Sequence, residues 1–247
     1  MANSPHILIT RPTGQQKQFA RDCQALGFRV SHLPCLAIEG LQNPSLNTER
    51  VSKACRILFT SSNAVRYADA LLPLPWRESA VQAIGPATAR ALVEKGQILA
   101  SEPAKPYNSE AFLLQADTLA PQRLIIIKGV GGRTLIGDTL EKLGWQVEHI
   151  DVYKRLLPQL SPSRIDEILQ PATPDVISVA SNETLTNLMT LSGKHRSEIL
   201  RAQLLVNSER CASLACDIGF RRTAIVAQPA GDQGQLASLK QWLNNQR

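Results

Sequence analysis

Residues 7–33 read ILITRPTGQQKQFARDCQALGFRVSHL, and residues 124–150 read LIIIKGVGGRTLIGDTLEKLGWQVEHI. Each stretch begins with a short apolar run, passes through a basic turn that contains glycine, and continues with the spacing of an amphipathic helix. A Leu-Gly pair ends each helical pattern, and a second strand-like run follows. The two stretches align without a gap. They therefore predict two copies of one strand–helix–strand unit.

Two further elements recur in the same order. RILFTSSNAVR at residues 56–66 is similar to DVISVASNETL at 175–185, and VQAIGPATARALVEKGQ at 81–97 is similar to LLVNSERCASLACDIGF at 204–220. In each case a strand ends in a small or polar turn that can cap the next helix. Chance similarity between α/β units is the alternative, but three elements in register favour duplication.

Strands that alternate with helices of about 10–15 residues indicate parallel sheets with helices on both faces. The fold class is therefore α/β, with two similar parallel-sheet domains. Between the repeated elements lie two loops rich in proline, serine and asparagine, which we interpret as crossings between the domains at residues 37–47 and 153–167. The first domain would then comprise 1–36 with 168–247, and the second would be an insertion over 48–152. The pattern alone leaves two consecutive domains open.

The net charge of +6 suits nucleic acid, a small polyanionic ligand or simply a solubilising surface. Aromatic residues make up only 4% of the chain, and no dense basic stripe occurs, which disfavours a nucleic-acid binder. The five cysteines and four histidines lack metal-ligand spacing, so we expect reduced, mostly buried thiols and no metal. No signal peptide and no apolar run of membrane-spanning length are found, so a cytoplasmic protein without membrane association is expected.

In parallel sheets, ligands bind beyond the carboxyl ends of the strands, where loops lead into helix N-termini. The loops predicted at that edge are rich in hydroxyls, glycines and amides, which suits a ligand with many anionic groups. An ordinary helix cap is the alternative for any one loop. No dinucleotide motif, phosphate-binding loop or serine-nucleophile motif occurs. The residues of these loops that we select for binding are Arg11, Thr60, Ser61, Ser62, Thr88, Lys128, Gly131, Gly132, Arg133, Ser181, Asn182 and Ser208.

Tyr153 follows the second strand of the repeat and precedes Lys154 and Arg155 at the proposed crossing. A phenol can donate a proton to a leaving hydroxyl or orient it, and neighbouring cations favour anionic groups nearby. The alternative is a tyrosine that packs a hinge strand.

Over essentially its whole length the chain resembles the uroporphyrinogen-III synthase family. The matching stretches, in order, are ILITRP, LPCLAIE, ILFTSSNAV, AIGPATARAL, KGVGGRTLIGDTL, VEHIDVYKR and LLVNSERCASLA. The resemblance implies two α/β domains joined by a two-stranded β connection, which favours the inserted second domain, and an active site in the cleft between them. It implies a cyclising lyase of haem biosynthesis that closes hydroxymethylbilane and inverts its last pyrrole.

The resemblance also implies roles for individual residues. Tyr153 matches the tyrosine proposed to assist departure of the hydroxyl. Thr60, Ser61 and Ser62 match a hydroxyl loop, Thr88 matches the threonine after its glycine turn, and Ser181 and Ser208 are the first-domain counterparts. The Asn207–Arg210 segment departs from the G-P-x-T turn of the second domain, so the correspondence is weaker at Ser208.

The same resemblance implies a polycarboxylate tetrapyrrole substrate, no cofactor, a monomer, and room for transient contact with neighbouring enzymes of the pathway. Two other classes of function compete with this prediction. One is a non-catalytic module that closes on a small anionic ligand, which would also show duplication and helix-terminal loops. The other is a DNA-binding regulator, which would bind duplex DNA with a steep salt dependence.

Overall fold

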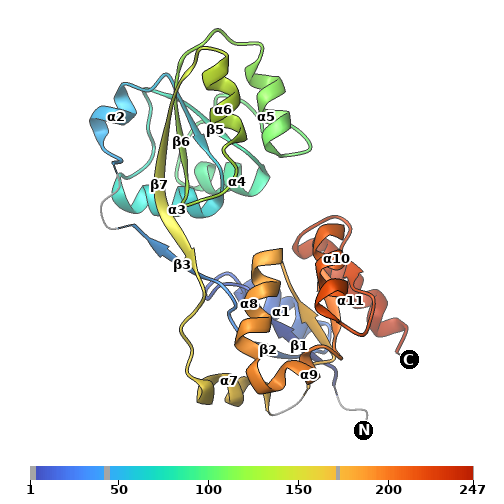
Figure 1. Ribbon diagram of the computed structural model, residues 1–247. Coiled ribbons are helices and arrows are strands. Elements are labelled where there is room, and N and C mark those ends of the chain that lie inside the picture. Colours follow the sequence, from blue (N-terminus) through green and yellow to red (C-terminus); the bar gives the residue numbers. More distant parts are fainter. Residues whose placement is uncertain (1–3, 42–44, 171–172, 247) are drawn as a thin grey trace. The chain divides into compact units, whose positions relative to one another are not determined.

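The computed structural model describes residues 4–41, 45–170 and 173–246 (Figure 1). The chain divides into two compact units: unit 1, formed by Met1–Ala37 with Leu156–Arg247, and unit 2, formed by Ile38–Arg155. The predicted crossing at 37–47 includes residues 42–44, which lie outside the described residues. So do positions 1–3, 171–172 and 247, which fall within the predicted first domain.

Unit 2 is built on a five-stranded sheet in the order β3-β7-β6-β4-β5. The pairs β4–β5, β4–β6 and β6–β7 are all parallel. The prediction of an α/β fold with parallel sheets is confirmed. The strands are β3 (Ala37–Gly40), β4 (Arg56–Phe59), β5 (Ala80–Ala83), β6 (Arg123–Gly129) and β7 (Gln146–Leu156).

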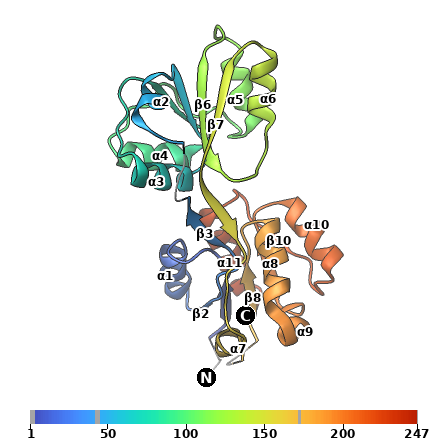
Figure 2. The ribbon, with the colours of Figure 1, turned by 60° about the vertical axis from the view of Figure 1, so that its left-hand side comes forward.

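Helices cover both faces of this sheet, because its central strands are apolar on both sides. Ile57 and Phe59 of β4 pack in a core with residues of α2, α3 and α4, whereas Leu58 faces a second core with residues of α5 and α6. Figure 2 shows α5 and α6 side by side. The helices are α2 (Thr48–Ser52), α3 (Ser62–Leu71), α4 (Pro86–Glu94), α5 (Ser109–Ala116) and α6 (Leu135–Lys142).

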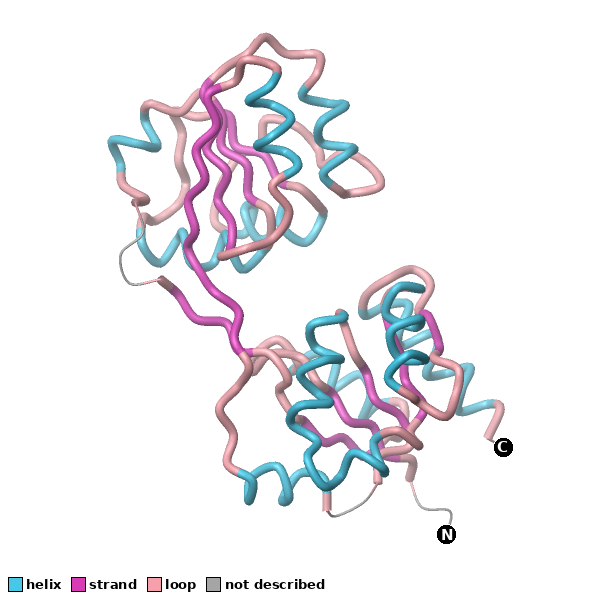
Figure 3. The backbone as a smooth tube through the Cα atoms, in the orientation of Figure 1, coloured by secondary structure: helices cyan, strands magenta, loops and turns pink. Residues whose placement is uncertain are grey.

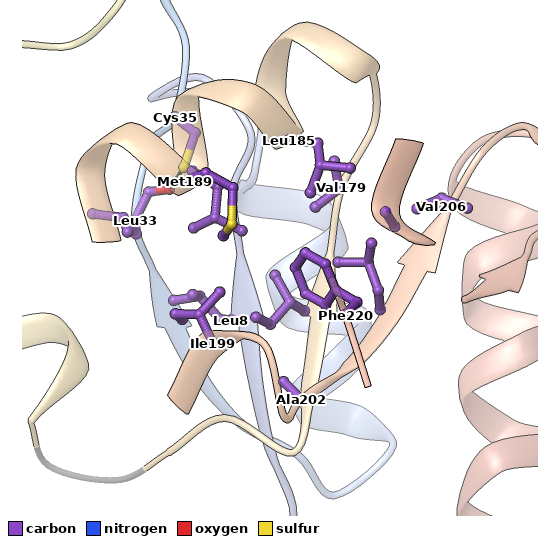
Figure 4. Close-up of a cluster of buried hydrophobic side chains, with 14 of the residues drawn as sticks. Leu8, Leu33, Cys35, Val179, Leu185, Met189, Ile199, Ala202, Val206 and Phe220 are labelled. Atoms are coloured by element: carbon purple, nitrogen blue, oxygen red, sulfur yellow. Dashed lines mark hydrogen bonds between the residues drawn. The ribbon is translucent and has the colours of Figure 1, made fainter. Parts of the chain in front are cut away.

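Unit 1 has a parallel sheet in the order β10-β9-β8-β1-β2, which separates helices on its two faces (Figure 3). Leu8 of β1 packs against residues of α8 and α10 and against Phe220 (Figure 4). Ile7 and Ile9 face the opposite core, with Phe19 of α1 and Leu239 of α11. The strands are β1 (His6–Ile9), β2 (Arg29–His32), β8 (Val176–Ser178), β9 (Gln203–Val206) and β10 (Ile225–Val226). The helices are α1 (Lys17–Ala25), α7 (Pro162–Leu169), α8 (Asn182–Ser192), η1 (Gly193–His195), α9 (Arg196–Ile199), α10 (Glu209–Ile218) and α11 (Asp232–Asn244).

The repeat seen in the sequence is also present in the sheets. The order β2-β1-β8-β9 in unit 1 corresponds to β7-β6-β4-β5 in unit 2. Ile7 pairs with Val30 in one sheet, and Leu124 pairs with Val147 in the other, at the positions that the repeat aligns. Each unit therefore combines the strand–helix–strand element of one sequence half with the remaining elements of the other half.

Local signals in the sequence set the helix ends. Ser61, Ser181 and Ser208 are N-caps whose side chains accept hydrogen bonds from backbone N–H groups of α3, α8 and α10. The Leu-Gly stops after α1 and α6 place Gly27 and Gly144 at φ values of 91° and 85°, a left-handed conformation that favours glycine.

A charged cluster ties α7 to the turn after α8. Asp166 accepts hydrogen bonds from Lys194 Nζ and His195 Nε2, each at 2.7 Å. The bond from Lys194, and then that from His195, holds the pKa of the Asp166 carboxyl below its ordinary range. Because the folded state depresses this pKa, the carboxylate stabilises the fold above its ordinary pKa, and that contribution is lost as the pH falls through the depressed value.

Asp166→Asn should therefore lower the melting temperature at pH 7, and the difference from the wild type should shrink as the pH falls below about 4. Thermal melts followed by circular dichroism at several pH values measure this. Asp217→Asn, at an exposed position in α10, is the control and should leave the pH dependence unchanged. A deficit of Asp166→Asn that stays constant down to pH 2 would contradict the assignment.

Candidate functional site

A pocket of about 370 Å³, here called the unit 2 pocket, lies at the carboxyl edge of the unit 2 sheet. It forms there because parallel strands direct the loops after β4 and β6 to the same edge. Ser62 and Thr88, also predicted for binding, are not among its lining residues. The predicted residues that the pocket brings together are Thr60, Ser61, Lys128, Gly131, Gly132, Arg133 and Tyr153.

Tyr153 lies within β7 and is held from several sides. It is 1% exposed, although it lines the pocket. Its ring stacks on Tyr67 with centroids 5.9 Å apart, and its hydroxyl lies 3.1 Å from Ser61 Oγ. Nη2 of Arg155 lies 3.5 Å from the same hydroxyl oxygen. The phenol therefore has a fixed ring position and a polar end with defined partners.

A register shift between β6 and β7 sets the direction of Tyr153. Lys128 pairs with Asp151, but the next residue, Gly129, pairs with Tyr153, so β7 contains one extra residue at this point. Such a bulge redirects the side chains that follow it. A Cβ atom on Gly129 would lie 2.5 Å from Cζ of Tyr153, so the ring occupies space that only glycine leaves open.

The hydroxyl loop after β4 has divided roles. Ser61 caps α3 through its bond with Ala64 N, and Thr60 donates a hydrogen bond to the carbonyl oxygen of Ile127 at 3.2 Å. Ser62 is the exposed first residue of α3. Thr88 is 4% exposed within α4, so its hydroxyl has little contact with solvent.

The described residues that line the pocket include three cations, Lys128, Arg133 and Arg155, and no aspartate or glutamate. Lys128 is largely buried and lies 3.3 Å from Asp151, whereas Arg133 forms an exposed pair with Glu110 at 3.1 Å. The N–H groups of Gly131 and Gly132 donate to no acceptor within the described part of the chain. These groups together favour an anionic ligand.

The sequence analysis did not select several of the lining residues. Tyr107 adopts φ 67°, which is uncommon for a residue other than glycine, and nothing in the local sequence indicates it. His149 lies against Gly137, where a Cβ would be 2.4 Å from Nε2. Its position opposite His32 in the repeat is the signal that could have selected it. The pocket residues that the sequence analysis missed include Tyr107, Asn108, Ser109, His149 and Arg155.

In unit 1, the predicted residues Arg11, Ser181, Asn182 and Ser208 follow β1, β8 and β9 at the corresponding edge of the sheet. Arg11 is 11% exposed, and its guanidinium lies 2.6 Å from Asp232. This arginine is thus already paired with a carboxylate of its own unit.

A buried glutamine organises the same edge. Gln235 of α11 is 0% exposed, accepts hydrogen bonds from Ser178 at 2.7 Å and Arg11 at 3.3 Å, and donates one to Asn207 at 2.9 Å. Gln235 and Asp232 were not predicted, because α11 lies far from these loops in the sequence.

The cysteines lack the features of reactive thiols where they are buried. Burial raises the pKa of Cys23 to about 12, an effect that Arg11 partly opposes, and burial also raises the pKa of Cys35 and Cys211. Cys55 and Cys216 are exposed, and all five thiols are free. Among the described residues, no cluster of histidine, cysteine, aspartate or glutamate has the geometry of a metal site. No helix in the described ranges has the length and apolar character needed to span a membrane.

Comparison with known proteins identifies the family. A family model described as "Uroporphyrinogen-III synthase HemD" matches residues 17–233. The chain belongs to the uroporphyrinogen-III synthase family. The uroporphyrinogen-III synthase of Salmonella typhimurium is 31% identical over 95% of this chain and 99% of its own length. The uroporphyrinogen-III synthase of Escherichia coli K12 is 29% identical, again over 95% of this chain and 99% of its own length.

Solved structures of uroporphyrinogen-III synthases share the fold. The protein from Helicobacter pylori 26695 has a TM-score of 0.66 at 15% identity and covers 97% of this chain and 99% of its own. A mutant from Thermus thermophilus has a TM-score of 0.60 at 18% identity, with 98% and 100% covered. The predicted family, fold class and lyase activity are confirmed, and membership of the uroporphyrinogen-III synthase family favours an enzyme over the two non-catalytic alternatives.

Gly129→Ala should move the Tyr153 ring, because the new Cβ would overlap it. We expect the free energy of unfolding to fall by about 1–3 kcal/mol, as for other overpacked cores, and turnover to fall with it. Urea denaturation measures the first effect.

Gly85→Ala is the matched control, since its Cβ would lie at an ordinary 3.6 Å from Tyr107 and only a glycine cap of α4 changes. It should cost about 1 kcal/mol or less. Equal stability losses in the two variants would contradict the close fit at Gly129.

Proposed function

We propose that this protein catalyses the uroporphyrinogen-III synthase reaction, in which hydroxymethylbilane closes into uroporphyrinogen III with inversion of the last pyrrole and loss of water. The observation that carries the proposal is the composition of the unit 2 pocket. It has three cationic side chains, no acidic side chain among its described lining residues, and a tyrosine with a fixed hydroxyl. A substrate with an acetate and a propionate on every pyrrole matches this lining.

In this proposal the pocket holds the substrate by its carboxylates. Lys128, Arg133 and Arg155 supply charge, and the N–H groups of Gly131 and Gly132 supply directed donors. Thr60, Ser61, Ser62 and Thr88 were proposed for the same role. The burial of Thr88 makes indirect action through the N-terminus of α4 the simpler assignment. In unit 1 we propose Arg11, Ser181, Asn182 and Ser208 as further binding residues. Arg11 would then have to exchange Asp232 for a substrate carboxylate.

Tyr153 is proposed as the proton donor to the departing hydroxyl. The carbon–oxygen bond breaks with its electron pair on oxygen, and the phenolic proton completes a water molecule. The lone pair of the pyrrole nitrogen forms the new double bond of the azafulvene. The nitrogen then releases its proton, which restores the phenol. Water is the net loss, and neither an oxidant nor a reductant is needed.

The remaining steps depend on orientation. The linear substrate can close unaided to the wrong isomer, so the protein has to hold the reacting carbons in the geometry for attack at the substituted position. Holding reacting groups in place can lower a barrier by about 7–11 kcal/mol. Binding many carboxylates through fixed amides and cations is a means to that end.

The same proposal includes a cytoplasmic monomer that uses no cofactor and has only transient contacts with neighbouring enzymes of the pathway. What supports it is the family's tetrapyrrole substrate, which carries the reacting groups itself. Analytical ultracentrifugation with and without the preceding enzyme would test both the monomer and the contact.

A coupled assay tests the function directly. Hydroxymethylbilane is supplied by its own synthase, this protein is added, and the oxidised products are separated by isomer. We expect isomer III in place of the isomer I that forms without the protein. Isomer I alone, in the presence of folded protein, would contradict the proposal and favour a ligand-binding module.

Tyr153→Phe should reduce kcat by about 100-fold or more, the range expected for loss of a general acid. The fold should lose only about 1 kcal/mol, because a single hydrogen bond to Ser61 disappears. Tyr67→Phe is the control, since it removes a comparable hydroxyl that donates to the carbonyl oxygen of Ile38 at 2.7 Å. If both variants keep wild-type kcat, Tyr153 is not the proton donor.

A further inference from the structure

Ser61 makes two contacts with one oxygen atom. Its Oγ accepts a hydrogen bond from Ala64 N at 3.1 Å, which caps α3, and lies 3.1 Å from the hydroxyl oxygen of Tyr153. A serine hydroxyl has one hydrogen to donate and two lone pairs to accept. Because the cap occupies one lone pair, the hydrogen of Ser61 stays available for the phenol.

The hydroxyl of Tyr153 can use its own hydrogen in one of two ways. If it donates to Ser61, that hydrogen is not available to a ligand. If it accepts from Ser61, the phenolic hydrogen is directed elsewhere. Arg155, whose Nη2 lies 3.5 Å from the phenolic oxygen, can only donate and so favours the accepting arrangement.

The ring itself has little freedom to change this choice. It is stacked on Tyr67, fills the space above Gly129 and is 1% exposed. With the ring fixed, the direction of the phenolic hydrogen depends on the partners of the oxygen. The remaining surroundings of Tyr153 include the unit 2 pocket, which it lines.

We propose that Ser61 is a positioning residue that donates its hydrogen bond to Tyr153 and so directs the phenolic proton into the unit 2 pocket. This inference rests on the proposed function of Tyr153 as the proton donor. It gives Ser61 a role apart from the carboxylate binding predicted from its loop. Ser61 would act through Tyr153, and its loss would change kcat rather than KM.

Ser61→Gly removes the hydroxyl and keeps a residue that caps helices nearly as well, at a cost of a few tenths of a kcal/mol relative to serine. We expect kcat for isomer III to fall about tenfold, with KM unchanged. Ser161→Gly is the matched control, because Ser161 caps α7 by the same bond to a backbone N–H, that of Arg164. It should keep wild-type kcat. Ser61→Thr, which retains a hydroxyl, should restore most of the lost kcat.

A double-mutant cycle separates positioning from a merely structural role. If Ser61 acts through Tyr153, Ser61→Gly should cause no further loss of kcat in the Tyr153→Phe background. A tenfold loss in both backgrounds, or a rise of KM at constant kcat, would overturn the inference. If wild-type protein yields isomer III but Tyr153→Phe keeps full kcat, the inference also fails while the function stands. Absence of isomer III with wild-type protein would instead be a failure of the function.

Discussion

The pairing of β6 with β7 is the interaction on which the candidate site depends. Up to Lys128 and Asp151 the two strands run in plain parallel register, and one residue later they do not. The extra residue in β7 leaves Val152 and Tyr153 both buried in succession, where a regular strand would alternate. Gly129 makes the shift sterically feasible, because its missing side chain is the space that the tyrosine ring fills. The hydroxyl of Tyr153 thereby reaches Ser61 at the N-terminus of α3.

Duplication explains why such an edge exists twice. Both sheets direct strand ends and helix N-termini to one edge, and serine caps stand at matching places in the two units. The chemistry has diverged. In unit 2 the edge contains a pocket lined by cations and by glycine N–H groups. In unit 1 the corresponding arginine, Arg11, is paired with Asp232, and Gln235 fills the hydrogen-bonding positions around it. An anionic ligand thus meets less competition in unit 2.

Signals that are local in sequence predicted much of this structure. The repeat, the parallel sheets, the serine caps and the Leu-Gly helix ends all depend on residues a few positions apart, so their spacing could be read directly. Thr60, Ser61 and the loop from Lys128 to Arg133 were found because strand ends collect at one edge. The β-bulge at Gly129, the left-handed Tyr107 and the network around Gln235 were not predicted. Each depends on contacts between segments distant in sequence, and bulges leave no regular pattern in composition.

The central claim is that the unit 2 pocket binds the polycarboxylate tetrapyrrole beside Tyr153. Amide chemical shifts of the full-length, isotope-labelled protein, recorded by NMR during an anaerobic titration with uroporphyrinogen III, test it most directly. The account predicts the largest shifts at the amides of Gly131, Gly132 and Arg133 and around Ser61, with smaller changes at the amino edge of the same sheet. Saturable shifts that leave these amides unmoved and concentrate elsewhere would contradict it.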